Sequence, residues 1–591
     1  MVRNLFKNGG LMALCCALIM CGCAGETDKT PETTSPVESV ETTAEVTTTA
    51  VLETTPVETT TAEPEVVSFE ETQKAVWFSK SEGFYSEDLD IELKVNGAQG
   101  VIRYTLDGSE PTETSEEYTG KITLLAANRT NPNCYLVRAK VFYSDGSSSE
   151  DVAHTYFVDV DVDERFTTYV FALWGDPDEI ATLLENYSAR GRESEKEIYV
   201  AAFDDKGNWE FSQFCGVRVY GGASRESSIK SLKLFARKSY DSLNGKFKTD
   251  MFGTLDEEGK VIDKYDKLVL RNAGNDFQFA YIRDELNQVL AMKAGYTDYE
   301  GVIPVVGYLN GSYYGFYWLH ENYCDEYFQQ KYGKADGEFV VIEGNDQWKF
   351  DKFMTEDEEP YYNEFNEMYQ DITARDLTDD AVYAELKEKL DVENYLDYFA
   401  FNIYFCNADW PNNNMKCYRY YAPEGSEYGE GVYDGRWRFL LHDMDYSYGM
   451  YDQTKVMANY DNLKRIMNAS HEKYAPLFTL LMQREDCRMY FADKLVELMN
   501  GVFTYQSIIG TLEEMSELRA TEMAYYYQYL EGLRNQGDAS IWTRSSHLQN
   551  YYDQIKAFAT SRPAYMIKFM EADLGVTIVD DNGTFKIELG E

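Results

Sequence analysis

Residues 407–414 read Asn-Ala-Asp-Trp-Pro-Asn-Asn-Asn, and further along the chain residues 442–445 read His-Asp-Met-Asp. Before the first stretch, apolar residues recur at helical spacing over residues 391–405, which predicts a packed amphipathic helix. Pro411 prevents that helix from continuing, so the residues around it should form a loop on a rigid support. Carboxylate and amide oxygens on such a loop are suitable ligands for a hard cation.

Asp409 and Asn414 have the spacing of the catalytic loop of protein kinases. In that loop the Asp orients the acceptor hydroxyl and the Asn binds a magnesium ion. A strand expected at residues 437–441 then leads to Asp443 and Asp445, whose spacing of two places both carboxylates on one side, where they could share the cation. The spacing alone is weak evidence, because an Asn-rich capped loop with two surface acids has the same pattern.

The bulk composition limits the classes of protein to which the chain can belong. Its 55 Lys and Arg against 102 Asp and Glu give a formal charge of -47 over 591 residues. This balance argues against a nucleic-acid partner, because phosphate binding needs a basic surface. The five His and ten Cys residues show no zinc-type spacing. Cys406 and Cys417 flank the 407–414 loop, and we expect two buried thiols there rather than a disulfide.

The N-terminus has the pattern of a targeting segment. Basic Arg3 and Lys7 precede an apolar stretch that ends in small residues at Cys23, which is similar to a bacterial lipoprotein signal over residues 1–22. Residues 23–66 are rich in Thr, Glu and Pro without apolar periodicity, and should form a disordered stalk. We therefore expect a protein held at the extracellular face of the cell membrane through lipidated Cys23. The alternative is an ordinary secretory signal.

Residues 76–159 have the pattern of a small all-β module, with alternating segments separated by Gly, Asp and Ser turns. Within it, residues 104–112 read Tyr-Thr-Leu-Asp-Gly-Ser-Glu-Pro-Thr, and Tyr118 and Gly120 follow. This run resembles the chitobiase/β-hexosaminidase C-terminal type of β-sandwich. The resemblance implies a spacer, or an accessory module that contacts carbohydrate or a surface protein, and it implies no catalysis.

Residues 164–591 should form the main domain, of the α+β class. Its first part alternates strands and turns around a helix predicted at 279–292. Its second part is mainly helical, including residues 474–574, and is interrupted by a hairpin of 416–421 with 436–441. A β-rich part followed by a helical part is the layout of a two-lobed kinase fold, although this layout alone is only an analogy.

A candidate phosphate cradle lies in the first part. Gly221 and Gly222 form a turn between two expected strands, where backbone N–H groups could approach phosphate oxygens, and Arg225 could add charge. The next strand carries Lys230 and Lys233 on opposite faces, so one of them would bind phosphate, and Lys230 is slightly favoured. The same Gly-Gly pattern is also typical of an ordinary turn.

Several segments in this order resemble the spore-coat protein H (CotH) kinase family. They are residues 221–235, 268–276 with 282–284, 309–321, 407–414 and 437–449, and the run Ser561-Arg562-Pro563 near the C-terminus is consistent with the family. The resemblance implies an atypical, secreted or surface protein kinase with a two-lobed kinase-like domain. Such a kinase uses ATP with Mg²⁺, or Mn²⁺, to phosphorylate Ser or Thr of proteins.

Carried over to this sequence, the resemblance makes Asp409 the catalytic-loop acid and Asn414 a metal ligand. The pair Asp443 and Asp445 stands for the metal-binding aspartate, with Asp443 as first choice. Glu321, at the end of the 309–321 segment, would lie near the nucleotide at the junction between the lobes.

Other positions of the resemblance have two interpretations. Arg271, Asn272, Asp276 and Arg283 could form a buried polar network between a strand and a helix, or could contact the nucleotide. Either carboxylate at 284–285 could be the partner of the phosphate-binding lysine.

The leading hypothesis is therefore a membrane-tethered extracellular kinase that acts on proteins of the cell surface. The main alternative is a non-catalytic adhesion or scaffolding protein on a kinase-like fold. A third hypothesis, a glycoside hydrolase, would need two acids on opposite sides of a sugar cleft, which the sequence does not locate.

Overall fold

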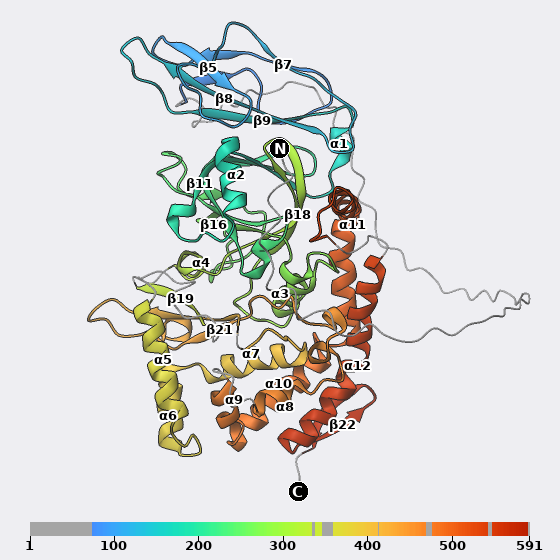
Figure 1. Cartoon of the computed structure of the whole chain (residues 1–591). Helices are drawn as coiled ribbons and strands as arrows, with labels where there is room; N and C mark the ends of the chain where they lie inside the picture. The colour runs from blue at the N-terminus through green and yellow to red at the C-terminus, as the bar shows by residue number, and fades with distance from the viewer. Residues whose placement is uncertain are drawn as a thin grey trace, which may run out of the picture. The chain divides into compact units, whose positions relative to one another are not determined.

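The computed structural model describes residues 74–333, 337–344, 359–411, 413–468, 475–541 and 547–588. The predicted signal peptide and stalk lie outside these ranges. Within the described ranges, no helix has both the length and the apolar composition needed to cross a membrane. The chain mixes α and β structure and begins with a β-rich module, as the sequence predicts (Figure 1).

The N-terminal module consists of short strands in three sheets. The main sheet has the order β2 (Gly83–Tyr85), β9 (Val152–Val158), β8 (Asn133–Phe142), β5 (Val101–Thr105) and β6 (Glu116–Glu117). The others pair β1 (Val76–Phe78) with β4 (Leu93–Val95), and β3 (Leu89–Ile91) with β7 (Ile122–Leu124). Strand alternation explains the last pair. Leu89, Ile91 and Leu124 are buried, whereas the facing Asp90 and Thr123 are joined by a 2.6 Å hydrogen bond at the surface.

The next part of the chain closes into a barrel. Its strand order is β10 (Tyr169–Trp174), β11 (Lys196–Phe203), β12 (Trp209–Tyr220), β13 (Ser231–Phe235), β16 (Lys267–Arg271), β18 (Ser312–His320) and β17 (Val302–Leu309). Strand pairing places Val219, Leu232, Leu270 and Leu319 side by side, and all four are buried in one apolar cluster. The inside of the barrel is therefore a packed core.

The other face of β13, β16 and β18 carries basic side chains. Lys233 pairs in register with Val269, and Val269 pairs with His320, so the three lie in one row. Arg271, two residues beyond Val269, lies on the same face because side chains alternate along a strand. Its guanidinium contacts the 442–445 loop of the second part of the chain. This face of the barrel therefore meets the segment that carries Asp443 and Asp445.

The remainder of the chain is mainly helical and contains a small sheet. The sheet has the order β19 (Glu338–Gly344), β20 (Met415–Tyr421) and β21 (Arg438–Leu440). The helices here are α4 (Asp325–Lys331), α5 (Glu359–Thr373), α6 (Asp380–Lys389), α7 (Val392–Tyr404), α8 (Asn462–Met467), α9 (Ala475–Leu481), α10 (Glu485–Asn500), α11 (Tyr505–Asn535) and α12 (Leu548–Leu574). A hairpin of β22 (Thr577–Asp581) and β23 (Thr584–Glu588) follows α12.

Helix α11 packs on the barrel strand β18 as well as on its helical neighbour α12 (Figure 1). Its fully buried Arg519 donates hydrogen bonds to the carbonyl oxygens of Tyr281 at 2.7 Å and Ala280 at 2.8 Å. Tyr526 of the same helix packs edge to face on Tyr281, with ring centroids 5.0 Å apart. A buried guanidinium needs such acceptors, so these bonds hold α11 in one register against the barrel.

The structure changes several predicted boundaries. The helix predicted at 279–292 begins only at Arg283, as α3 (Arg283–Lys293), because Asp276 accepts hydrogen bonds from the backbone N–H of Ile282 at 2.8 Å and of Arg283 at 3.0 Å. The segment predicted to be helical at 474–574 is divided among α9 to α12. The predicted hairpin gains β19 as a third strand. Cys406 and Cys417 are both free and buried, which confirms the expectation of two thiols.

We expect Asp276→Ala to lower the free energy of unfolding by about 3–5 kcal/mol, because it leaves the fully buried Arg283 without its ion-pair partner. Urea unfolding followed by circular dichroism measures the change. The control is Asp376→Ala, which removes an exposed carboxylate that accepts from the backbone N–H of Thr378 at 2.9 Å and should cost about 1 kcal/mol. Equal losses in the two variants would contradict a structural role for the buried pair.

Candidate functional site

The 407–411 segment starts from a helix end whose carbonyl groups are satisfied by other elements. Arg562 of α12, which is fully buried, donates to the carbonyl oxygens of Ile403 at 2.9 Å and Tyr404 at 2.7 Å. Asn462 of α8 lies 3.4 Å from the carbonyl oxygen of Ile403. The last carbonyls of a helix have no partner within the helix, so these contacts fix the end of α7. The loop after α7 therefore begins from a rigid base.

Asp409 is oriented by two Asn residues that follow it. Asn413 Nδ2 donates to Asp409 Oδ1 at 2.7 Å, and Asn414 Nδ2 lies 3.4 Å from Oδ2. Burial raises the pKa of Asp409 and the charge of Asp443 adds to this, while the bonds from the Asn residues oppose it. A carboxylate with a raised pKa accepts a proton more readily near neutral pH.

The 442–445 segment brings two further carboxylates to this loop. Strand β21 ends at Leu440, and Asp443 has a positive φ of 52°, so the segment turns instead of continuing as a strand. The expectation that strand alternation puts Asp443 and Asp445 on one side is therefore corrected. It is the turn that lets both carboxylates reach the same guanidinium. Asn414 Nδ2 lies 3.5 Å from the carbonyl oxygen of Asp443, which joins the two segments.

That guanidinium belongs to Arg271. Its Nη2 contacts Asp443 Oδ1 and lies 3.3 Å from Asp445 Oδ2, and its Nε lies 3.3 Å from Asp284 Oδ2 of α3. Arg271 is only 7% exposed. Burial disfavours its charge, but the surrounding carboxylates outweigh burial and raise the pKa of Arg271. When all three are ionised, the carboxylates exceed the guanidinium by two negative charges.

Asp443 and Asp445 have different environments. Asp445 accepts hydrogen bonds from Asn275 through both oxygens, from the backbone N at 2.7 Å and from Nδ2 at 2.9 Å. The Asp445 carboxylate also lies against the backbone of Gly274. A Cβ at position 274 would be only 2.1 Å from Asp445 Oδ2, so a larger residue would collide with it. Burial and the charge of Asp443 raise the pKa of Asp445. For Asp443, burial is outweighed by the charge of Arg271, which lowers the pKa. Asp443 is thus the more exposed and more readily ionised of the two.

The predicted glycine cradle is a turn that Arg225 holds together. Gly221 has a φ of +100°, which other residues rarely adopt. Arg225 donates to the carbonyl oxygen of Gly221 at 2.5 Å, and to those of Tyr187 at 2.7 Å and Ala189 at 3.1 Å. Its guanidinium is therefore engaged with three backbone carbonyls, and the turn that includes Gly222 is fixed to the segment after α2 (Pro177–Glu185).

The two predicted phosphate-binding lysines lie in different surroundings. Lys230 Nζ donates to the carbonyl oxygen of Arg225 at 2.7 Å and lies 4.3 Å from the ring centroid of Tyr187. Lys233 Nζ lies 5.6 Å from the ring centroid of Tyr220, and burial lowers the pKa of Lys233 to about 8. In the described parts of the chain, neither lysine forms an ion pair with Asp409, Asp443 or Asp445.

Glu321 is buried at the end of β18. Its carboxylate accepts hydrogen bonds from the backbone N of Gly301 at 2.8 Å and from Thr254 Oγ1 at 2.9 Å, and burial raises its pKa to about 7. These contacts are with the barrel and its loops rather than with the 442–445 segment. The expected contact with a nucleotide therefore stays a prediction.

A row of ionisable side chains beside the site was not predicted from the sequence. Lys416 Nζ of β20 lies 3.2 Å from His442 Nε2 and 3.4 Å from Glu343 Oε2 of β19. On the other side of the ring, His442 Nδ1 lies 3.9 Å from Glu300 Oε2. The sequence signal for this row was Lys416, which lies two positions after Asn414 in a strand rich in buried aromatic residues.

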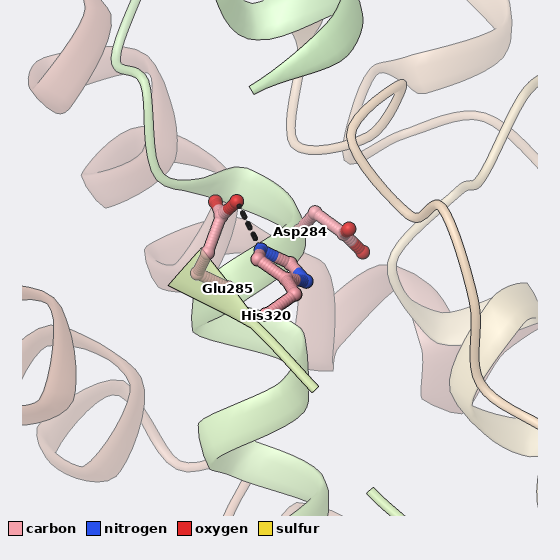
Figure 2. A group of neighbouring side chains, drawn as sticks. All are labelled: Asp284, Glu285 and His320. Carbon is pink, nitrogen blue, oxygen red and sulfur yellow. Dashed lines mark hydrogen bonds and ion pairs between the residues drawn. The ribbon is translucent and has the colours of Figure 1, made fainter. Parts of the chain in front are cut away.

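A second cluster consists of Asp284, Glu285 and His320, whose ligand-type atoms lie within 4.8 Å of one another. Figure 2 shows the Glu285 carboxylate directed at the imidazole, with the Asp284 carboxylate pointing away from Glu285. His320 Nε2 lies 3.0 Å from Glu285, its Nδ1 lies 3.4 Å from Glu300, and Asp284 is paired with Arg271. The cationic partners of these acids come from the protein, so the cluster fits an ion-pair network better than a metal site.

Arg271, Asn272, Asp276 and Arg283 were predicted either to form a buried polar network or to contact the nucleotide, and their surroundings differ. Asn272 is fully buried, its Nδ2 donates to the carbonyl oxygen of Ile229 at 2.7 Å, and its Oδ1 accepts from Ser231 Oγ at 2.8 Å. Asp276 and Arg283 pair with each other inside the fold. These three residues are architectural, whereas Arg271 belongs to the carboxylate site.

The residues at the site fit a divalent cation. Asp443, Asp445 and Asn414 supply oxygen atoms of the kind that Mg²⁺ and Mn²⁺ prefer. When all three carboxylates are ionised, their excess of two negative charges over Arg271 matches the charge of one such ion. Asn413 Oδ1 is also buried without a hydrogen-bond partner among the described residues.

We expect the free energy of unfolding to depend on His320 between pH 6.5 and 9. Burial lowers the pKa of His320, but its bonds to Glu285 and Glu300 outweigh burial and raise the pKa from 6.5 to about 9. A raised pKa means that the stabilisation is complete below pH 6.5 and is lost as the pH rises through 9. The difference between wild type and His320→Gln should therefore shrink by about 3 kcal/mol over this range, measured by urea unfolding at pH 6 and pH 9.5.

Replacing the exposed His547 by Gln is the control for the loss of a histidine side chain at the surface. A constant difference for His320→Gln would contradict a charged His320.

Comparison with known proteins gives two family matches. The model of the chitobiase/beta-hexosaminidase C-terminal domain matches residues 80–153. The model of the CotH kinase protein matches residues 217–566, which is more than half of the chain and includes Asp409, Asn414, Asp443 and Asp445. No curated protein matches the chain significantly. Both matches confirm the resemblances noted in the sequence, and the chain belongs to the CotH kinase protein family.

Proposed function

We propose that the chain is an atypical protein kinase that transfers the γ-phosphate of ATP to Ser or Thr of secreted or surface proteins. The barrel and the helical part would be the two lobes of its kinase-like fold. The observation that carries the proposal is the convergence of Asp409, Asn414 and Asp443, with Asn414 within 3.5 Å of both others. Asp409 and Asn414 come from the loop after α7, and Asp443 comes from the loop after β21.

Each residue has a role in phosphoryl transfer that suits its surroundings. Asp409, with its raised pKa, orients the acceptor hydroxyl and takes its proton as the new O–P bond forms and the bond to the ADP leaving group breaks. Asn414 and Asp443 would hold Mg²⁺ or Mn²⁺, which neutralises phosphate charge when bound. Asp445 is held in place by Asn275 and completes the acidic set.

We also propose that the protein is tethered to the extracellular face of the cell membrane through lipidated Cys23. The signal-like pattern over residues 1–22 and the Thr-rich composition of 23–66 support this placement. The protein substrates would then be surface proteins, and the N-terminal module would contact carbohydrate or a surface protein, or act as a spacer. The charge of -47 disfavours nucleic acid as a partner.

The proposal is tested with the purified full chain, labelled ATP and Mg²⁺ or Mn²⁺. Asp409→Ala should reduce autophosphorylation by about 10²-fold or more, because general-base catalysis typically contributes 10²–10⁴-fold, while ATP affinity should change little. Asp443→Ala should reduce both transfer and the affinity for Mn²⁺. Glu424→Ala, which replaces an exposed acid in the connection between β20 and β21, is the matched control and should behave like wild type.

Transfer that is retained in Asp409→Ala would contradict the assignment of this residue. If the wild type shows neither transfer nor a rise in melting temperature with MgATP, the chain would be a non-catalytic adhesion or scaffolding protein instead.

A further inference from the structure

We propose that Arg271 is the cation of the barrel that contacts the phosphates of ATP, and that Lys230 and Lys233 do not. This inference rests on the proposed kinase function. It assigns to an arginine of β16 the phosphate contact for which the sequence offered two lysines, Lys230 just before β13 and Lys233 within it.

Arg271 lies beside the carboxylates that are proposed to bind the metal ion. Arg271 is the last residue of β16, on the face of the barrel that meets the 442–445 loop. Its Nη2 touches Asp443, the more exposed of the two candidate metal-binding aspartates. A divalent ion that binds these carboxylates would also bind the phosphates of the nucleotide, so a cation beside Asp443 is within reach of them.

Lys230, Arg225 and Lys416 already have polar partners within the protein, and Lys233 faces aromatic rings. Lys230 Nζ is bonded to a backbone carbonyl 2.7 Å away, and Arg225 is bonded to three such carbonyls. Lys416 lies between His442 and Glu343. Lys233 forms no ion pair in the described parts of the chain, but its Nζ sits over the rings of Tyr220 and Phe235 and burial lowers its pKa.

Arg271 is also positioned by a carboxylate from a neighbouring helix. Asp284 of α3 lies 3.3 Å from its Nε, and the backbone N of Met444 donates to the other Asp284 oxygen at 2.8 Å. This arrangement resembles the pair in which a helix carboxylate positions the strand lysine of a protein kinase. It also decides between the two candidate acids, because Glu285 is engaged with His320.

The donor groups of the guanidinium also suit phosphate. An arginine presents five N–H groups in a planar fork that matches phosphate oxygens. The hydrogen bonds that Arg271 forms within the described residues both use Nη2. Its Nε faces Asp284 at 3.3 Å, whereas Nη1 forms no hydrogen bond or ion pair with another described residue. Donors of a nine-tenths buried side chain are thus left over for a further acceptor beside Asp443.

The test compares Arg271→Met with Lys230→Met and Lys233→Met in the purified full chain. Calorimetric titrations with MgATP and with adenosine, which lacks phosphates, give the nucleotide affinities. Electron paramagnetic resonance with Mn²⁺ alone gives the metal affinity. Arg271→Met should weaken MgATP about 10- to 100-fold, which is typical for loss of charged hydrogen bonds, and should leave adenosine unchanged. The two lysine variants should stay within about twofold of wild type for MgATP.

The Mn²⁺ arm separates a phosphate contact from a merely structural role. Loss of Arg271 removes a positive charge from the metal-binding carboxylates, so their affinity for Mn²⁺ should be unchanged or higher. A structural collapse of the site would lower the affinities for Mn²⁺ and MgATP together, and that result would overturn the proposal.

If Arg271→Met does not fold, Arg271→Lys decides the question, because it keeps the charge but loses the planar fork. Its MgATP affinity should fall by about tenfold with adenosine binding unchanged, and an unchanged MgATP affinity would overturn the proposal. The assignment of Arg271 would be wrong if Arg271→Met bound MgATP as tightly as wild type, or if Lys230→Met or Lys233→Met lost MgATP affinity instead. Neither result would contradict the kinase function. A wild type that does not bind MgATP would overturn the kinase function as well.

Discussion

The buried guanidinium of Arg271 is the interaction on which the organisation of the site depends. It brings Asp284 of the barrel half, and Asp443 and Asp445 of the helical half, around one positive charge. Like charges buried this close would repel one another strongly in a medium of low dielectric constant. When no metal ion is bound, the guanidinium therefore supplies the positive charge that lets three carboxylates lie together, and it ties the barrel to the acidic loop at the point where phosphate chemistry is proposed.

The helical half supports the same place from the other side. Arg562 and Asn462 satisfy the carbonyl groups at the end of α7, so the loop with Asp409 starts from a fixed position. Arg519 does the equivalent for the segment before α3, through the carbonyl oxygens of Ala280 and Tyr281. A buried guanidinium needs hydrogen-bond acceptors, so these contacts favour one packing of the helices over alternatives that would remove them.

Much of the fold could be predicted from local patterns, and the errors have physical causes. The amphipathic period over residues 391–405 predicted α7. The start of α3 was misplaced because Asp276, several residues upstream, caps it. Strand β19, the third strand of the small sheet, was not predicted because it pairs with β20 from a distant part of the sequence. A local pattern of residues carries no information about such a pairing.

The sequence by itself determined the family and the mixed α and β class with its β-rich module, and it predicted Asp409, Asn414, Asp443 and Asp445 as residues of the site. It did so because residue types at fixed spacing are local properties of the chain. Only the tertiary structure decided which basic group accompanies them. Lys230 and Arg271 are equally cationic in the sequence, but one donates to the carbonyl oxygen of Arg225 and the other to Asp443. The partner of a charge depends on which distant elements fold against it, and only the folded chain contains that information.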